Sequence, residues 1–579
     1  MTWAGSLSRF AGSKGGNVAI TFALASLPLL AFTGAAIDYG MATRMQAKLQ
    51  ASADATALAL CQTPLSTTNV VLQAQASTLS LDYMGKTSGV IVDALGITSN
   101  PRKITLTTHI NSKTFFPRFT GVSSPLVSAS SQCATPLPKT FEIAMVLDNT
   151  GSMSESSGSQ TKLQAVQQAA SNFVDYVQTN GAFSSSSRIS IVPFAAAVAI
   201  DPVVSGTATA SWVDTKGLSA YHWTNVDQSS ARALGFTSRL SIFNALKLVN
   251  SSWGWAGCFE AQPYPESVQD GAPSSASTQA GFNSLYVPLF APDEPGSGST
   301  GYAAWNPSNN NSNAATNYSF NSYINDSNGF NSCSNSATSF ATVEKQACKY
   351  YNASGAQSTA YNQYTGLPNG PNFQCVSKPL QRLTTSGTTL KALINSLTAA
   401  GSTNIHDGIL WGWRTLSPLS VFADGAAYSP ANSTSSTATT KVIILMTDGT
   451  NSWPDNPYTN YNQTLYFSHG YLTNADGSDP TPTMPTSYQT ISSISTTAQQ
   501  RNALDELTLE TCTNAKTAGV SIYTIGFSVP SDPIDSQGVT LLKNCATSSS
   551  QAFIANDSNS LIAAFGQIAA SIGALRISQ

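Results

Sequence analysis

The sequence predicts a doubly wound α/β domain that follows a transmembrane helix and a small α+β module. Two nearly continuous apolar runs, at 141–148 (FEIAMVLD) and 441–449 (KVIILMTDG), are typical of parallel strands that are buried on both faces. A segment with helical spacing at 162–177 and a further apolar run at 188–195 complete a strand, helix, strand unit. Strands that alternate with helices in this way indicate a parallel sheet with helices on both sides.

The composition argues against a nucleic-acid partner. Charged residues make up only 10% of the 579 residues, and the formal net charge is -3. A protein that holds a phosphate backbone needs a basic surface, which this composition does not provide. At roughly 150 residues per domain, the length allows three or four units.

The first hydrophobic segment predicts a membrane anchor. Residues 17–37 carry no charge, and at ~1.5 Å per residue they form about 31 Å of helix, enough to cross the hydrocarbon core of a bilayer. Arg9 and Lys14 precede this run, and Asp38 follows it directly. The positive-inside rule therefore places residues 1–16 in the cytoplasm as a short tail and the bulk of the chain on the other side of the membrane.

A cleaved signal peptide is the alternative, since Gly34 and Ala36 supply small residues for a cleavage site. Against it, residues 38–61 continue the helical pattern without a break. Apolar or small side chains recur there at every fourth position, at Met41, Met45, Leu49, Ala53, Ala57 and Cys61. This spacing favours one continuous rod that is retained as an anchor.

The rest of the chain divides by composition. Residues 38–138 combine the continued helix with β-type runs and end in a Pro-rich linker, which predicts a small α+β module. The α/β domain is expected in two parts, 139–200 and 386–579. Between them, residues 201–385 are rich in Ser, Asn, Gly, Tyr and Trp, and we interpret them as one long insertion. A second polar insertion is expected at 451–496.

The cysteines predict disulfides. Eight occur, dispersed and with no C-x-x-C pair, and four of them fall in the long insertion. In a chain that leaves the cytosol this pattern favours disulfides over metal ligation, although the sequence leaves the connectivity open. Cys512 and Cys545 flank the apolar run 520–527, one before it and one after it, so we expect these two to be bonded.

Polar side chains follow the strands at the same edge of the predicted sheet. Asp148 and Asp448 each end an apolar run, and ligands of doubly wound sheets bind beyond the carboxyl ends of the strands. Thr150 and Ser152 add hydroxyls in the first loop, and Thr403 lies just ahead of a helix in a third loop. Carboxylates and hydroxyls without thiolates make a hard oxygen site that suits Mg²⁺, with Ca²⁺ or Mn²⁺ also possible.

These three separated pieces resemble the metal-ion-dependent adhesion site (MIDAS) of von Willebrand factor A (vWA) domains. The usual form of that motif is D-x-S-x-S with a distal Thr and a distal Asp, and the departure here is Thr150, which keeps the hydroxyl. The resemblance implies a Rossmann-like vWA fold in which Thr150, Ser152 and Thr403 coordinate the metal by their hydroxyls. It further implies that Asp448 acts through water, that Asp148 acts directly or through water, and that a carboxylate from a protein partner completes the shell.

The N-terminal residues also resemble a family. RFAGSKGGNVAITFALASLPLLAFTGAAIDYG, followed by LQASADATALAL, is similar to the start of TadG-like proteins of the Flp (tight adherence) pilus assembly system. The resemblance implies an inner-membrane protein, with a pilin-like module at 38–138, whose partners are pilus assembly components. Related pilin-like proteins are cut after a glycine that a glutamate follows five residues later. Gly16 would place Thr21 at the glutamate position, so a retained anchor is expected.

Three weaker candidates have ordinary structural interpretations. His406 lies close to Thr403, but a histidine at a helix start is more often a hydrogen-bonding cap. Asp293 and Glu294 form either a second cation site or a solvated turn. Trp411 and Trp413 are interpreted as core residues, and not as ligand anchors.

Rival functions are less well supported. A Ser/His/Asp hydrolase is disfavoured because no G-x-S-x-G elbow follows a strand and the four histidines lie in unrelated contexts, so we expect no enzymatic activity. A cytosolic vWA chelatase subunit would lack the membrane anchor. A surface adhesin that binds host or matrix ligands directly stays open beside a pilus assembly protein.

Overall fold

The computed structural model divides the chain into two compact units, Met1–Leu137 and Pro138–Gln579. Residues 1–16, with Arg9, Lys14 and Gly16, lie outside the described residues. The structure describes residues 17–63, 67–86, 89–98, 103–116, 125–134, 139–201, 207–274, 277–296, 303–305, 317–325, 333, 339–353, 365–428, 438–454 and 460–574.

The first unit is built on one long helix, α2 (Asn17–Cys61). Its apolar side chains are exposed between Ile20 and Phe32, whereas Leu49, Ala53 and Leu60 are buried in the core of the module. Among the described residues, this is the one helix that is long and apolar enough to cross a membrane. The helix passes from the apolar run into the module without a break, as the spacing predicts.

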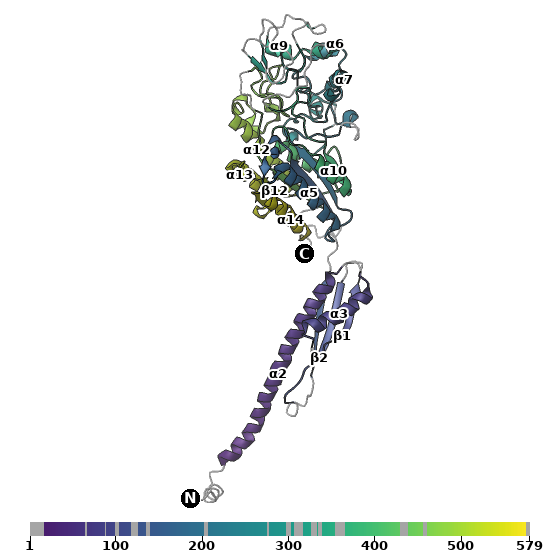
Figure 1. The fold of residues 1–579 in the computed structure, drawn as a ribbon, viewed down its shortest axis with the longest axis vertical. Helices are drawn as coiled ribbons and strands as arrows, with labels where there is room; N and C mark the ends of the chain where they lie inside the picture. Colours follow the sequence, from purple (N-terminus) through teal and green to yellow (C-terminus); the bar gives the residue numbers. More distant parts are fainter. Residues whose placement is uncertain are drawn as a thin grey trace. The chain divides into compact units, whose positions relative to one another are not determined.

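A short helix and a three-stranded sheet complete this unit (Figure 1). The antiparallel sheet has the order β1-β2-β3, with a helix, α3, before it. The bounds are α3 (Asn69–Tyr83), β1 (Ile91–Thr98), β2 (Lys103–Asn111) and β3 (Leu126–Ala134). A disulfide between Cys61 and Cys133 joins the end of α2 to β3. Both α2 and the sheet therefore share one core, and the bridge fixes them together.

The second unit contains a six-stranded sheet of order β10-β7-β4-β11-β12-β13. The strands pair in parallel except for β10, which is antiparallel at one edge. Their bounds are β4 (Phe141–Asp148), β7 (Arg188–Phe194), β10 (Gln381–Thr384), β11 (Thr440–Thr447), β12 (Ser521–Phe527) and β13 (Ala552–Ala555). The sequence analysis did not identify β10, which lies inside the range expected for the insertion, or β13.

Helices cover both faces of this sheet, which confirms the doubly wound α/β class. Side chains at odd positions of β4, such as Met145, pack on one layer of helices, and those at even positions, such as Val146, pack on the other. The first layer is α5 (Lys162–Thr179), α10 (Gly387–Ser396) and α14 (Ser558–Ala574), and the second is α11 (Ile405–Leu416), α12 (Thr497–Thr517) and α13 (Ser536–Cys545). Trp411 and Trp413 belong to the second core, so their interpretation as packing residues is confirmed.

The insertion has a core and short elements of its own. They are α6 (Gln228–Ala233), α7 (Arg239–Val249), α8 (Gln279–Asn283), β8 (Ala303–Trp305), β9 (Asn317–Ser319) and α9 (Phe340–Glu344). In Figure 1 the helices α6, α7 and α9 gather at the end of this unit away from α14. Disulfides Cys258–Cys375 and Cys333–Cys348 connect the insertion internally. Tyr466, from the second polar segment, packs in the same cluster as Cys258 and Cys375, so the two polar segments fold together.

Candidate functional site

The site lies where two adjacent strands end. β4 and β11 pair in parallel with Leu147 opposite Met446, so Asp148 lies level with Thr447, and Asp448 follows one residue later at the same edge. Asp148 is fully buried, and the hydroxyl of Thr447 donates to its Oδ2 at 2.6 Å. Parallel register therefore gives the strand-end carboxylates a shared edge, and Thr447 is a member of the site that the sequence analysis missed.

The first loop places two hydroxyls between these carboxylates. After Asp148 the chain enters a single 3₁₀ turn, Gly151–Ser154, with Thr150 at its start. The Thr150 N–H donates to Asp148 Oδ1 at 2.8 Å, and its Oγ1 lies 3.2 Å from Ser152 Oγ. Ser152 Oγ donates in turn to Asp448 Oδ1 at 2.8 Å. Hydrogen bonds of Thr150 and Ser152 thus connect Asp148 to Asp448.

The third loop closes over the first two. Gly151 N–H donates to the carbonyl of Gly401 at 2.9 Å, and the carbonyl of Thr403 accepts from Ser452 N–H at 2.9 Å. A Cβ at Gly449 would stand 3.8 Å from Thr403 Oγ1, which places that hydroxyl against the loop after Asp448. All five residues expected from the sequence, Asp148, Thr150, Ser152, Thr403 and Asp448, therefore lie at one edge of the sheet.

A buried lysine also belongs to this site. Lys162 is the first residue of α5, and its Nζ lies 2.7 Å from Asp448 Oδ2 and 2.5 Å from Asp532 Oδ2. Neither Lys162 nor Asp532 was among the site residues predicted from the sequence. A signal for the lysine exists, because Lys162 falls on the stripe of α5 that also carries the buried side chains of Val166 and Ala169. A lysine on an apolar stripe requires a buried partner for its charge.

The two carboxylates of the site differ in their counter-charges. Burial opposes the charge of Lys162, yet Asp448 and Asp532 hold its pKa above its usual value, so Asp448 has its own cation. Burial raises the pKa of Asp148 to about 7, and the charge of Asp448 adds to this effect. Asp148 is contacted by the neutral donors Thr447 and Thr150. A buried carboxylate without a counter-charge is unfavourable, and a divalent cation would relieve it.

The donor set fits a hard cation. Two carboxylates and three hydroxyls offer the oxygen ligands that Mg²⁺, Ca²⁺ and Mn²⁺ prefer. Within the described ranges, no group of three or more His, Cys, Asp or Glu side chains is arranged to hold a metal ion.

His406 has a different role from the one expected. The N-cap of α11 is Asn404, whose side chain accepts from Asp407 N–H, so the interpretation of His406 as a cap is wrong. His406 is buried, and its Nε2 lies 2.8 Å from the carbonyl of Ser267 in the insertion. Burial lowers its pKa to about 4. The neutral imidazole therefore connects α11 to the insertion.

Asp293 and Glu294 do not form a solvated turn, because both are fully buried. Asp293 Oδ1 accepts from the N–H groups of Tyr323 and Ile324, each at 2.7 Å, and Lys349 Nζ lies 3.2 Å from its Oδ2. The carboxylate of Glu294 accepts hydrogen bonds from the insertion and from the second polar segment. The chain's own ammonium group thus supplies the positive charge that a second cation would bring.

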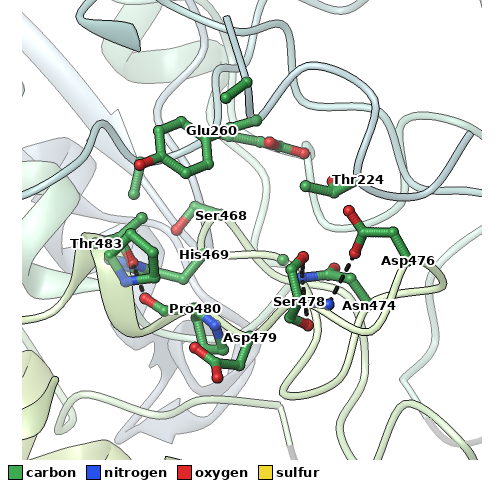
Figure 2. A pocket seen from close by; sticks show the side chains of 15 residues that line it. Thr224, Glu260, Ser468, His469, Asn474, Asp476, Ser478, Asp479, Pro480 and Thr483 are labelled. Atoms are coloured by element: carbon green, nitrogen blue, oxygen red, sulfur yellow. Dashed lines mark hydrogen bonds between the residues drawn. The ribbon is translucent and has the colours of Figure 1, made fainter. Parts of the chain in front are cut away.

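A pocket of about 180 Å³ lies where the two polar segments meet (Figure 2). Its acidic and imidazole side chains are already engaged within the chain. Glu260 pairs with Arg239, Asp476 accepts from Ser478 N–H at 2.9 Å, and Asp479 accepts from Thr481 N–H at 2.9 Å. His469 Nδ1 lies 2.8 Å from Thr483 Oγ1. These contacts stabilise the junction of the segments, and we assign no ligand to the pocket.

Among solved structures, the chain is similar to pilus-associated proteins at low identity. Against the vWF domain of the type V pili tip protein Mfa5 from Porphyromonas gingivalis, identity is 12% over 76% of this chain and 97% of that chain, with a TM-score of 0.30. Against the adhesive tip pilin GBS104 from Group B Streptococcus agalactiae, identity is 11% over 75% of this chain and 100% of that chain, with a TM-score of 0.31. Against the pilus adhesin SpaC from Lactobacillus rhamnosus GG, identity is 12% over 84% of this chain and 33% of that chain, with a TM-score of 0.29. The chain therefore spans about a third of the length of SpaC.

No curated protein matches the chain. A family model, described as "Putative Flp pilus-assembly TadE/G-like", matches residues 16–59. The match covers the apolar run and most of the continued helix α2, which are the residues that carried the expected resemblance. The N-terminal segment of this chain is therefore TadE/G-like, and the expectation from its sequence is confirmed.

Proposed function

We propose that this chain is a membrane-anchored envelope protein that binds protein partners through a metal-dependent vWA domain, in the assembly of a Flp/Tad pilus. The observation that carries the proposal is the convergence of three loops at one sheet edge, where hydrogen bonds of Thr150 and Ser152 connect the buried carboxylate of Asp148 to Asp448. The TadE/G-like match supports the connection to the pilus.

Asp148, Thr150, Ser152, Thr403 and Asp448 would hold the metal, with Mg²⁺ as the first choice and Ca²⁺ or Mn²⁺ as alternatives. When bound, the cation supplies a Lewis-acidic position at which a carboxylate of a partner protein completes the shell. The ion pair with Lys162 leaves Asp448 with less negative charge to offer. A carboxylate from outside is therefore the ligand that best balances the charge of the site.

The anchor defines where this binding takes place. We infer that residues 17–37 cross the inner membrane once, with residues 1–16 in the cytoplasm and the bulk of the chain in the periplasm or at the cell surface. Arg9 and Lys14 before the run and Asp38 after it support this orientation. Four disulfides support an oxidising compartment for both units.

A binding role agrees with the surroundings of Ser152, which donates to Asp448. Each of the four histidines has a partner other than this serine: His109 pairs with Asp93, and His222 pairs with Asp214. His406 and His469 contact Ser267 and Thr483 respectively. No histidine therefore activates Ser152 in the way that a Ser/His/Asp hydrolase requires.

Calorimetric titration of the detergent-solubilised full chain with Mg²⁺ and Mn²⁺ tests the proposal. The wild type is expected to bind, and Asp148→Ala is expected to abolish binding while leaving the fold intact. Ser152→Ala should weaken binding less, because water can replace a hydroxyl, and Thr150→Ser is the matched control with nearly unchanged binding. Identical flat traces for the wild type and Asp148→Ala would overturn the metal-dependent mechanism.

A surface adhesin that binds host or matrix ligands directly is the second candidate function, and the low-identity likeness to adhesins does not decide it. Deletion of the gene, with imaging of pili, separates the two. Loss of pili is expected for an assembly protein. Intact pili with lost adhesion would favour the adhesin.

A further inference from the structure

The segment that follows β2 is fixed to the helix α2 at the boundary of the apolar run. Phe115 and Phe116 follow β2, and their backbone N–H groups donate to the two carboxylate oxygens of Asp38, at 2.8 and 3.1 Å. Asp38 is buried, and it is the first charged residue after the apolar run 17–37. Figure 1 shows β2 beside α2 in this unit. Phe115 and Phe116 therefore lie at the level where the proposed membrane span ends.

The ring of Phe116 continues past this level. A Cβ at Gly34 would stand only 3.0 Å from Phe116 Cγ, so the ring lies against the helix where glycine leaves room for it. Gly34 precedes Asp38 by about one helical turn, roughly 5–6 Å along the axis. The loop after β2 thus contacts α2 inside the apolar run, and not only at its border.

The side chains around this contact are apolar and uncovered. Phe115 is 66% exposed, Leu126 at the start of β3 is 65% exposed, and Tyr39 on α2 is 73% exposed. Toward the N-terminus of α2, Ile37 and the large apolar side chains from Ile20 to Phe32 are exposed. A bilayer around residues 17–37 is continuous with this patch. Tyrosine rings such as that of Tyr39 are enriched where hydrocarbon meets water, and phenylalanine rings insert at the boundary of headgroups and acyl chains in interfacial segments.

We propose that Phe115 inserts into the outer interface of the bilayer and forms a second membrane contact of this unit beside α2. The partner is a lipid surface, and the inference rests on the proposed span at residues 17–37. Asp38 holds the backbone of the loop, Phe116 packs on Gly34, and Phe115 is left to contact lipid. A second contact beside α2 fixes the distance of the module from the bilayer. A single helix can shift along the membrane normal and does not fix this distance.

Site-specific fluorescence in reconstituted vesicles tests this proposal. All eight cysteines are paired in four disulfides, so one introduced cysteine gives a unique thiol. The full chain in phosphatidylcholine vesicles is labelled with an environment-sensitive fluorophore at Lys113→Cys, which keeps both phenylalanines. Nitroxide lipids are added with the quencher near the headgroup or deep in the acyl chains. Phe22→Cys, within the span, and Val70→Cys, at the start of α3, are the membrane and water references.

The label at position 113 is expected to be quenched at least threefold more by the shallow nitroxide than the label at Val70. Adding Phe115→Ser should reduce that quenching to the level at Val70, whereas Phe115→Trp should retain it. Quenching at position 113 equal to that at Val70, with position 22 quenched by the deep nitroxide, overturns the loop contact and leaves the span intact. Absence of quenching at position 22 overturns the span itself, and the loop contact with it. Quenching at position 113 that Phe115→Ser does not reduce also contradicts the role of this ring.

Discussion

At the scale of single residues, the two strand-end carboxylates of the candidate site have different neighbours. Lys162 pairs with Asp448, whereas the neutral donors Thr150 and Thr447 contact Asp148. Asp148 and Asp448 could be placed together because each ends an apolar run, and parallel strands present their carboxyl ends at one edge. The partners of Lys162 could not be predicted, since its contacts with Asp448 and Asp532 form only after the chain has folded. Residue type alone does not show which carboxylate a buried lysine selects.

Removal of Lys162 is expected to make the fold depend on divalent cations. In Lys162→Met, Asp448 loses its buried partner, and breaking such a pair costs about 3–5 kcal/mol. Mg²⁺ should restore part of this loss, because it returns positive charge to the site. The measurement is the thermal unfolding midpoint of the solubilised chain with and without Mg²⁺.

Lys441→Met is the matched control, since Lys441 and Glu142 form a buried pair at the start of the β4 and β11 strands, away from the site. It should lose a similar amount of stability without any recovery in Mg²⁺. Equal recovery of the two variants would contradict a metal site beside Asp448.

Glu344 is expected to make the second unit less stable as pH rises. Burial raises its pKa to about 8, and the charge of Glu294 adds to this, so the folded chain keeps a proton that the unfolded chain releases above the ordinary pKa of glutamate. Glu344 alone should therefore lower the free energy of unfolding by about 3 kcal/mol between pH 5 and 7.5, and the raised pKa of Asp148 adds to the fall. Glu344→Gln should flatten this dependence and raise the unfolding midpoint at pH 7.5, and the exposed Glu155→Gln should change neither. An unchanged slope in Glu344→Gln would show that another group carries it.

At the scale of elements, the sequence analysis succeeded for long segments and missed short ones. β4, β11 and β12 are central, so both faces are buried and the composition identifies them. β10 and β13 have four residues each and lie at the two edges of the sheet. Pairing with the one adjacent strand determines their conformation more than their composition does. The elements of the insertion could not be predicted for a similar reason, because its core joins segments that are distant in sequence.

The disulfide Cys512–Cys545 confirms the pairing expected from the elements on either side of β12. It joins α12 to the end of α13 with a separation of 33 residues, and both cysteines are buried against the sheet. In the loop-entropy account, a bridge of this length stabilises by about 3–4 kcal/mol. The double variant Cys512→Ala, Cys545→Ala should lower the unfolding midpoint of the second unit accordingly. A midpoint within error of the wild type would mean that packing alone holds α13.

At the scale of the whole molecule, the sequence allows two fates for the N-terminal segment, which is either retained as an anchor or removed as a signal peptide. A signal peptide would be removed near Gly34 or Ala36, yet α2 runs through both positions without a break and ends at the disulfide Cys61–Cys133. Residues on both sides of these positions also fall within the TadE/G-like match. Phe116 packs against Gly34, so cleavage there would remove one side of a formed contact.

We therefore expect the mature chain to retain residues 17–37. An epitope tag at the N-terminus should stay with the full-length chain in the membrane fraction, and the intact mass should include this segment. An alkaline phosphatase reporter joined after residue 139 should be active, because only an exported enzyme forms its disulfides. The same reporter joined within the tail at residue 14 should be inactive. A mature chain that begins near Asp38, or phosphatase activity at residue 14, would reverse the assignment of the segment as a retained anchor with a cytoplasmic tail.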